Sequence, residues 1–220
     1  MIILGADEAR RGPVLGPLII SGATIDEKDE IKLEKLGVKD SKKLTKKKRE
    51  ELYPKILKKV RNYKIIEIWP KEIDEALESQ ELNLNWLEAH KTAEIINELG
   101  PDKAFIDCPS PNKKRYEDYL RELLDNKEIE LVVEHKAEKY PIVAAASIIS
   151  KVYGDNIIKE LQKKFDTSMG PGYMSNEITQ KFLKENWEKH PEIFRKSWIS
   201  WKNHKNKKEQ KTLDMFNKNK

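Results

Sequence analysis

Acidic residues follow three of the apolar segments in this 220-residue sequence and have the types and spacing of a metal site. Asp7 and Glu8 come directly after the first segment, Asp107 ends the fourth, and Glu134 and Glu138 follow the fifth. The carboxyl ends of strands in an open α/β sheet meet at one edge, so we expect these acids to lie close together. Clustered carboxylates repel one another unless cations neutralise them, and oxygen ligands suit hard ions such as Mg²⁺ or Mn²⁺. Two such ions about 4 Å apart can activate a water and stabilise the leaving oxygen of a phosphodiester.

A purely structural role for the same acids stays open at this point. Carboxylates at strand ends commonly cap the following helix or face solvent. Spacing alone therefore does not decide between a metal site and ordinary helix caps.

The segments that would position these acids alternate between strand-like and helix-like patterns, which is typical of a layered α/β fold. We predict strands over residues 2–6, 18–25, 64–69, 103–107 and 129–134. We predict helices over residues 45–60, with Thr45 as the N-cap, and over 83–99, 112–125 and 141–165. Two more helices are expected before residue 201.

Charge and composition divide the chain into a neutral body and a basic end. The net charge is +5, and residues 202–220 hold seven lysines against Glu209 and Asp214, so residues 1–201 are neutral overall. Any affinity of the body for nucleic acid must therefore come from local clusters. The single cysteine, Cys108, cannot form an internal disulfide, which fits a reducing compartment. We expect a cytoplasmic protein, since the sequence has no signal peptide pattern and no apolar run near the ~20 residues that span a bilayer.

Several short motifs of the sequence are more specific than its periodicity, and they resemble those of the ribonuclease HII family in its archaeal form. The resemblance covers residues 1–201 in the family's order. The segments that carry it are Gly5-Ala6-Asp7-Glu8-Ala9-Arg10-Arg11-Gly12-Pro13-Val14-Leu15-Gly16-Pro17, Asp40-Ser41-Lys42-Lys43-Leu44, Phe105-Ile106-Asp107, residues 134–149, Gly172-Tyr173 and Arg195-x-x-Trp198.

The resemblance implies a fold, a metal site and a reaction. The fold would be ribonuclease H-like: a five-stranded mixed sheet flanked by helices, with a helical C-terminal part inside a catalytic domain of residues 1–201. Asp7, Glu8, Asp107 and Glu138 would be catalytic and would hold two Mg²⁺ or Mn²⁺ ions. The enzyme would hydrolyse the phosphodiester 5′ of a ribonucleotide in RNA/DNA hybrids or RNA–DNA junctions, leaving 3′-hydroxyl and 5′-phosphate ends. Such an endonuclease removes ribonucleotides and primers during DNA replication and repair.

The resemblance also implies which residues bind the substrate. Backbone groups of Arg10, Arg11 and Gly12 would surround the 2′-hydroxyl, the one chemical mark of a lone ribonucleotide. The ring of Tyr173 would lie against the sugar on the 3′ side; a turn aromatic covering a helix end is the alternative. Lys42 and Lys43 would neutralise phosphates without reading sequence, although a solvated helix face is the alternative for such a basic cluster.

The basic end contains a short motif that fits a sliding-clamp-binding box. Gln210, Leu213 and Phe216 have the spacing Gln-x-x-Leu-x-x-aromatic, and one helical turn would put Leu213 and Phe216 on one face for an apolar groove. Asn217 replaces the usual second aromatic residue. We expect residues 202–220 to be a flexible tail on a protein that is a monomer, with a chance match of the motif as the alternative.

Three departures from the family pattern bear on activity. Arg10 stands where the family has glycine, so a need for positive φ or a close approach to the nucleotide would make its side chain costly. Glu138 stands where the family has Asp, which moves the carboxylate by one methylene. Tyr153-Gly154 replaces a typical Glu/Thr-Arg pair before Asp155.

These departures keep a second function open: a catalytically weakened protein on the same fold that binds hybrids or junctions. A nucleotide-binding α/β protein that uses the loop between Gly12 and Gly16 ranks last. The sequence contains neither a Gly-x-x-x-x-Gly-Lys-Ser/Thr nor a Gly-x-Gly-x-x-Gly string.

Overall fold

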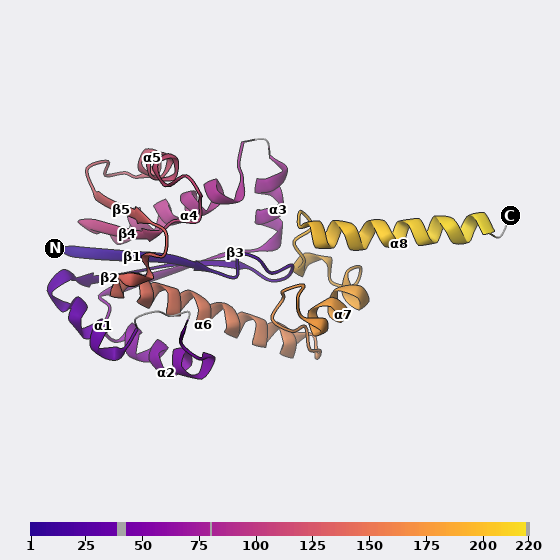
Figure 1. Cartoon of the computed structure of the whole chain (residues 1–220), viewed down its shortest axis with the longest axis horizontal. Coiled ribbons are helices and arrows are strands. Elements are labelled where there is room, and N and C mark those ends of the chain that lie inside the picture. The colour runs from indigo at the N-terminus through magenta and orange to yellow at the C-terminus, as the bar shows by residue number, and fades with distance from the viewer. Residues whose placement is uncertain (39–42, 80, 219–220) are drawn as a thin grey trace.

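A five-stranded mixed sheet forms the centre of the molecule (Figure 1). The structure, a computed structural model, describes residues 1–38, 43–79 and 81–218, and for 209 and 211–218 it describes the backbone alone. The strands run in the order β3-β2-β1-β4-β5. Their bounds are β1 (Ile2–Ala9), β2 (Leu18–Asp26), β3 (Asn62–Ile68), β4 (Lys103–Asp107) and β5 (Glu130–Glu134).

The pairing of the strands brings the carboxyl ends of three of them to one edge. β1 is antiparallel to β2, and β2 is antiparallel to β3. β1 is parallel to β4, and β4 is parallel to β5. Because parallel neighbours end on the same side, the residues at the ends of β1, β4 and β5 lie next to one another. The predicted five-stranded mixed sheet is confirmed.

Helices cover both faces of the sheet (Figure 1). One face carries α6 (Pro141–Lys164), which packs along β1 and β2, together with α1 (Glu30–Leu36) and α2 (Lys46–Leu57). The opposite face carries α3 (Pro70–Glu78), α4 (Leu84–Leu99) and α5 (Lys113–Leu123). The C-terminal part contains α7 (Glu177–Asn186) and α8 (Ile199–Lys218), and the short 3-10 helices are η1 (Glu27–Asp29), η3 (Ala137–Lys139) and η4 (Pro191–Ile193).

Local sequence signals fixed the ends of several helices as predicted. The Thr45 hydroxyl accepts a hydrogen bond from the Lys48 backbone N–H (3.2 Å) and caps α2. The Asn83 side chain accepts from the Trp86 backbone N–H (3.1 Å) and caps α4, which ends at Gly100 in the left-handed conformation. These are the side-chain types that satisfy free N–H and C=O groups at helix ends.

The prediction for the C-terminal segment was wrong, because residues 202–218 are helical rather than unstructured. They continue α8, which projects away from the body (Figure 1). Two features favour this helix: Lys, Glu and Gln are good helix formers, and the ring of Trp201 packs near that of Trp187, with centroids 6.1 Å apart. Helices α1 and α3 were also missed by the sequence analysis.

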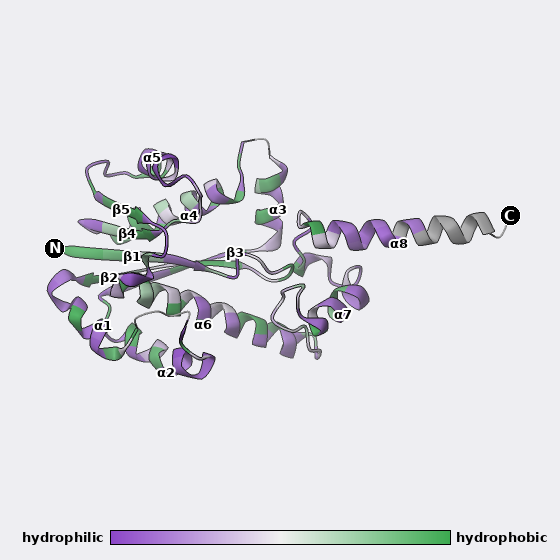
Figure 2. Cartoon of the chain, in the orientation of Figure 1, coloured by the Kyte–Doolittle hydropathy of each residue, from purple (hydrophilic) through white to green (hydrophobic). Residues whose placement is uncertain are grey.

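The buried residues are mainly apolar and lie between the sheet and its helices. Figure 2 shows hydrophobic residues in green along the strands and hydrophilic residues in purple on much of the helices. One core lies between the sheet and α3–α5, and a second lies between the sheet and α1, α2 and α6. A third core joins α6 to the C-terminal part through Leu15, Met169 and Phe194. In the parts of the chain that the structure describes, no helix has the length and apolar character to cross a membrane.

Helix α6 approaches the backbone of the sheet very closely at Gly5 in β1. A Cβ atom there would lie 2.5 Å from the backbone carbon of Ile142 and 2.5 Å from the backbone nitrogen of Val143, both in the first turn of α6. Backbone atoms cannot move aside as a flexible side chain can, so only glycine permits this packing.

We predict that Gly5→Ala lowers the free energy of unfolding by about 3 kcal/mol, since α6 must move away from β1 to accommodate the methyl group. Urea denaturation measures this loss. Gly37→Ala is a matched control: it lies in the left-handed conformation with no atom within 4 Å of the new Cβ, so we expect about 1 kcal/mol from backbone strain alone. Equal losses for the two variants would contradict a steric role for Gly5.

Candidate active site

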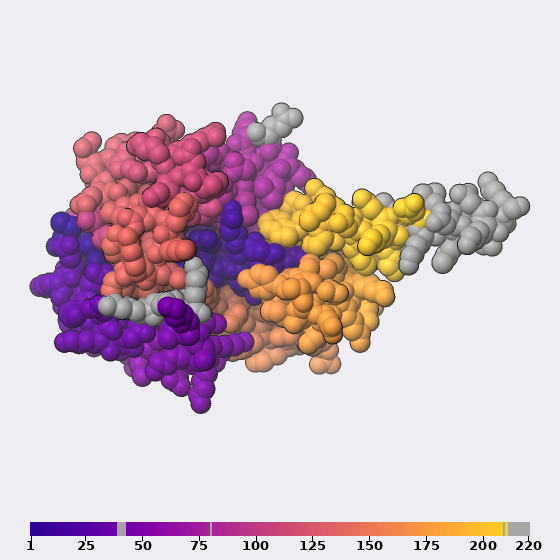
Figure 3. Space-filling model, viewed as in Figure 1, coloured from indigo at the N-terminus to yellow at the C-terminus, as the bar shows by residue number. Residues whose placement is uncertain are grey.

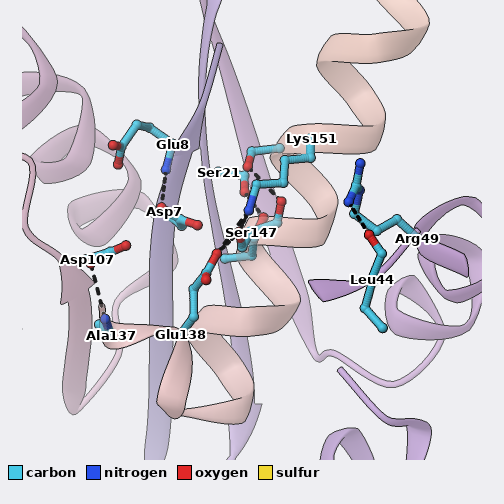
Figure 4. A network of polar contacts seen from close by, with 12 residues as sticks. Asp7, Glu8, Ser21, Leu44, Arg49, Asp107, Ala137, Glu138, Ser147 and Lys151 are labelled. Carbon is cyan, nitrogen blue, oxygen red and sulfur yellow. Dashed lines mark hydrogen bonds and ion pairs between the residues drawn. The ribbon is translucent and has the colours of Figure 1, made fainter. Parts of the chain in front are cut away.

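The four predicted metal-binding acids lie at one edge of the sheet (Figure 4). Asp7 and Glu8 are near the end of β1, Asp107 is the last residue of β4, and Glu138 is in η3, directly before α6. Asp7, Glu8 and Asp107 line one small cavity of about 10 Å³. The structure therefore brings together acids from β1 and β4 that lie about a hundred residues apart in the sequence.

Two details differ from the sequence analysis. β1 extends to Ala9, so Asp7 and Glu8 lie within the strand rather than after it, and successive side chains point to opposite faces of the sheet. Glu134 does not join the cluster, because it forms an ion pair with Lys139.

The ionised forms of the acids at this edge are disfavoured by burial and by the negative charges of their neighbours. Burial raises the pKa of Asp7 well above its ordinary value, and the charges of Glu8 and Asp107 raise it further. Burial also raises the pKa of Glu8 to about 7, with further contributions from Glu88 and Asp107. A cation between these carboxylates would favour their ionised forms, and a set of oxygen donors fits a hard divalent ion. In chemical type the residues present therefore fit a metal.

The carboxylates are turned toward hydrogen-bond donors rather than toward one common point. Asp107 accepts from the Ala137 backbone N–H (3.1 Å), and Glu138 accepts from the Ser147 hydroxyl (2.6 Å) and the Lys151 ammonium (2.9 Å) (Figure 4). As oriented, no three His, Cys, Asp or Glu residues of the described chain are placed to hold one ion. Like charges separate in this way when only protein donors neutralise them, so ion binding requires these side chains to rotate inward.

The loop after β1 is held by Arg195, which is completely buried. Its guanidinium donates to the carbonyl oxygens of Arg10 (2.7 Å), Arg11 (2.8 Å) and Gly16 (3.0 Å). Its backbone N–H donates to the carbonyl of Val14 (2.9 Å). Burial lowers the pKa of Arg195 to about 9, and the nearby charge of Arg10 adds to that shift. Arg195 is therefore a cation at neutral pH that fixes the course of the loop.

Arg10 has a φ of 62°, the left-handed conformation to which glycine is suited. Its side chain is 7% exposed. It lies over Gly154 of α6, where an added Cβ would be 2.5 Å from the Arg10 Cδ. The side chain thus packs between the loop and α6 and is largely buried.

Arg11 ties the same loop to α4 on the opposite face of the sheet. Its Nε donates to Glu88 Oε1 (2.8 Å), and its Nη2 donates to Asn85 Oδ1 (2.6 Å). Glu88 is 2% exposed, and burial raises its pKa to about 7 although the charge of Arg11 lowers it. This pair links the loop to a helix that also lines the acid cavity.

Tyr173 stands beside the loop. Its Cε1 atom is 3.4 Å from the position that a Cβ of Gly12 would occupy, and its side chain is 43% exposed. The backbone N–H of Val14 donates to the carbonyl of Gly172 (2.8 Å), which fixes the turn that carries Tyr173. A groove of about 490 Å³ runs past the loop and is lined by both Glu8 and Tyr173. Figure 3 shows N-terminal residues in indigo recessed on this side of the molecule, beside the orange and yellow C-terminal part.

The two lysines predicted to contact phosphate have different outcomes. Lys42 lies outside the described residues. Lys43 is exposed and does not line the groove. Among the described residues, the cations that do line it are Arg10, Arg11, Arg49 and Lys151.

The predicted clamp-binding residues lie on α8. Gln210 is exposed there, whereas the side chains of Leu213 and Phe216 are outside the described part of the structure. The helical backbone is compatible with the one-turn spacing of the motif.

The sequence analysis missed four residues that support the site: Glu88, Ser147, Lys151 and the side chain of Arg195. Ser147 and Lys151 are four residues apart on α6, so helical periodicity signals that they share a face. Arg195 belongs to the Arg-x-x-Trp motif, so the sequence singled it out but did not predict that its side chain binds the loop carbonyls. Glu88 has no local signal, because only the tertiary fold places α4 behind the loop.

Comparisons with known proteins agree on one family. The family model described as Ribonuclease HII matches residues 4–201. A ribonuclease HII from Methanococcus maripaludis is 46% identical over 210 residues, covering 92% of this chain and 86% of that protein. The crystal structure of ribonuclease H2 from Pyrococcus horikoshii is 38% identical with a TM-score of 0.85, covering 94% of this chain and 98% of that one.

A second solved structure is that of a PCNA:RNase HII complex from Archaeoglobus fulgidus. It is 39% identical with a TM-score of 0.79, covering 90% of this chain and 95% of that one. A family model over most of the chain, together with relatives above 30% identity over nine-tenths of it, decides the family. The chain belongs to the ribonuclease HII family and is a metal-dependent endonuclease of the ribonuclease H class.

Proposed function

We propose that this chain cuts the phosphodiester 5′ of a ribonucleotide in RNA/DNA hybrids and RNA–DNA junctions, leaving 3′-hydroxyl and 5′-phosphate ends. The observation that carries the proposal is that Asp7, Glu8 and Asp107 all line one small cavity, next to a groove lined by the loop and Tyr173. A nuclease site needs both halves: carboxylates for the reaction and a recognition surface for the sugar. The groove past the loop connects them, since it is lined by both Glu8 and Tyr173.

Asp7, Glu8, Asp107 and Glu138 are the residues that would hold Mg²⁺ or Mn²⁺, with two ions per site. Bound ions of this kind supply an activated water and stabilise the leaving oxygen. The chain's own contribution is to hold the carboxylates in place. Ser147 and Lys151 donate to Glu138 and so position this acid, which is one methylene longer than the family's Asp.

Recognition of the ribose would rest on a loop whose shape is fixed before substrate arrives. Arg195 holds the carbonyls of Arg10 and Arg11, and Glu88 holds the side chain of Arg11. A fixed loop loses little conformational entropy on binding, so small differences between a 2′-hydroxyl and a hydrogen can be discriminated. Tyr173, packed beside Gly12, would contact the neighbouring sugar.

The C-terminal helix would connect the enzyme to a sliding clamp. The sequence of the box at Gln210, Leu213 and Phe216 supports this, as does the archaeal relative whose structure is a complex with PCNA. We further propose that residues 1–201 form the catalytic domain, that residues 202–220 form the clamp-binding appendage, and that the protein is a cytoplasmic monomer.

Replacing Asp7 by Asn should reduce cleavage of a duplex with one ribonucleotide at least about a hundredfold, because a neutral amide is a weak ligand for a hard cation. Duplex binding without metal should be largely unchanged. Glu134→Gln is the matched control at the same sheet edge, and we expect it to cut normally because Glu134 pairs with Lys139. Cleavage is measured with Mg²⁺, Mn²⁺ or chelator, beside an all-DNA duplex. Binding without metal-stimulated cutting by the unaltered chain would instead support the hybrid-binding alternative.

The metal-free protein should become less stable as the pH rises from 5.5 to 8. The pKa of Asp7 is raised and those of Glu8 and Glu88 are raised to about 7, so the folded state keeps protons that the unfolded state releases above about pH 4.5. This stability is present at low pH and is lost as the pH passes through about 7. We expect Tm to fall by roughly 3 °C or more, and Mg²⁺ at pH 8 to restore part of the loss. In Asp7→Asn the fall should be smaller; an equal or larger fall would contradict this origin.

Phe216→Ala should weaken binding to an archaeal PCNA at least about tenfold, since aromatic anchors carry much of the energy of such interfaces. Clamp-dependent stimulation should disappear, while cutting of short duplexes without the clamp stays unchanged. Asn217→Ala is the matched control, because Asn217 replaces the motif's second aromatic residue. Calorimetric titration of clamp with each variant measures the effect, and equal affinities for both variants would remove the box from the interface.

A further inference from the structure

The guanidinium of Arg10 is buried with very few partners. Its Nη2 donates to the Leu15 carbonyl at 3.3 Å, which is the one hydrogen bond of this side chain among the described residues. Its Nε is buried and has no hydrogen-bond partner in the described structure. A buried cation without hydrogen-bonding partners is unfavourable, so a guanidinium in this state is suited to receive an anion.

The surroundings of Arg10 carry charges of both signs, but none of the described acidic groups forms a hydrogen bond with its guanidinium. Arg195 lies close enough for the two guanidiniums to repel each other, since Arg10 lowers the pKa of Arg195. The acidic groups that face Arg10 are Asp155, whose carboxylate also approaches Lys46 (3.9 Å), and the phenol of Tyr173. Neither is hydrogen-bonded to Arg10 in the described structure.

Arg10 opens onto the groove that passes the loop. This groove is lined by Arg10, Arg49 and Lys151, with Tyr173 at its side. Among the described residues, four cations line this groove of about 490 Å³ (Arg10, Arg11, Arg49 and Lys151) against two acids, Glu8 and Asp155, so its lining favours an anionic strand such as a nucleic-acid backbone.

The space for the Arg10 side chain is provided by Gly154. A Cβ at this position would lie 2.5 Å from Arg10 Cδ and 3.1 Å from Cγ, so any other residue at 154 would displace the arginine. Both positions depart from the family's pattern: position 10 has arginine where the family has glycine, and position 154 has glycine where the family has arginine. The two residues that touch here therefore have the glycine and the arginine interchanged relative to the family.

We propose that the Arg10 side chain binds a backbone phosphate of the nucleic-acid strand in this groove, and that Gly154 is its required complement. The proposal rests on the nucleic-acid substrate of the proposed function. In this proposal the Arg10 guanidinium contacts the substrate directly, in addition to the contacts made by the loop backbone. A phosphate would satisfy the buried donors and offset the repulsion between Arg10 and Arg195.

Equilibrium binding of a duplex with one ribonucleotide, measured in chelator over a series of salt concentrations, tests the contact. Arg10→Gln keeps a side chain at the same positive φ but removes the charge. We expect its affinity to fall about five- to tenfold and the slope of log K against log salt to decrease by about 0.9, the value for one phosphate contact. Arg10→Lys should keep most of the slope. Lys71→Gln, at an exposed position on α3, is the control and should change neither quantity.

A double-mutant cycle tests the complementarity. Gly154→Ala alone should weaken binding and lower Tm, because the methyl group displaces Arg10. In the Arg10→Gly background, Gly154→Ala should have a much smaller effect. Without the arginine, the nearest atom to the new methyl group is Ile19 Cγ1, at 3.2 Å. Glycine also suits the positive φ of position 10. Additive effects of the two changes would contradict the pairing. Arg10→Gly also serves for the salt series if Arg10→Gln does not fold.

Failure of this inference and failure of the proposed function are separable. An unaltered chain that cuts at ribonucleotides, with Arg10→Gln binding at unchanged affinity and slope, overturns the phosphate contact alone. An unaltered chain that binds duplexes but does not cut overturns the proposed reaction, and the salt series still decides the role of Arg10.

Discussion

The close approach of α6 to β1 at Gly5 sets the geometry on which the site depends. With no side chain at this position, the first turn of α6 rests directly on the strand that carries Asp7 and Glu8. Glu138 immediately precedes this helix, and Ser147 and Lys151 lie along it. One steric constraint in the strand therefore brings an acid and its two hydrogen-bond donors to the carboxyl end of β1.

Arg195 plays the corresponding part for the recognition side of the site. It binds three loop carbonyls with one guanidinium, and Phe194 next to it forms an antiparallel bridge with Leu15. The loop is thus shaped by the C-terminal part of the body rather than by its own sequence. Burial of the Arg195 cation beside Arg10 brings two positive charges together, and burial of the acids beside Glu8 brings negative charges together. Both arrangements are unfavourable without a bound partner of opposite charge. A substrate phosphate would neutralise the first pair of charges, and a divalent cation would neutralise the second.

The sequence predicted most of the fold because its strong elements are locally encoded. All five strands and the long helices α2, α4, α5 and α6 were found from the apolar and helical patterns of the sequence, with Thr45 predicted as the N-cap of α2. Helices α1 and α3 were missed, since they have seven and nine residues and offer few repeats of a 3.6-residue pattern. The helical continuation of α8 past residue 201 was missed because it buries no apolar face along most of its length, and only propensity and the Trp201 contact indicate it.

By itself, the sequence determined the acids, the loop residues and their family, because these are encoded in residue types and spacing along the chain. It also identified Arg10 and Gly154 as departures, but as two unrelated ones. Only the tertiary structure decided that they touch, that Arg11 pairs with Glu88, and that Glu134 stays outside the acid cluster. These contacts depend on which helix packs on which face of the sheet. Burial and the pairing of charges result from that packing, and no local segment of the sequence encodes them.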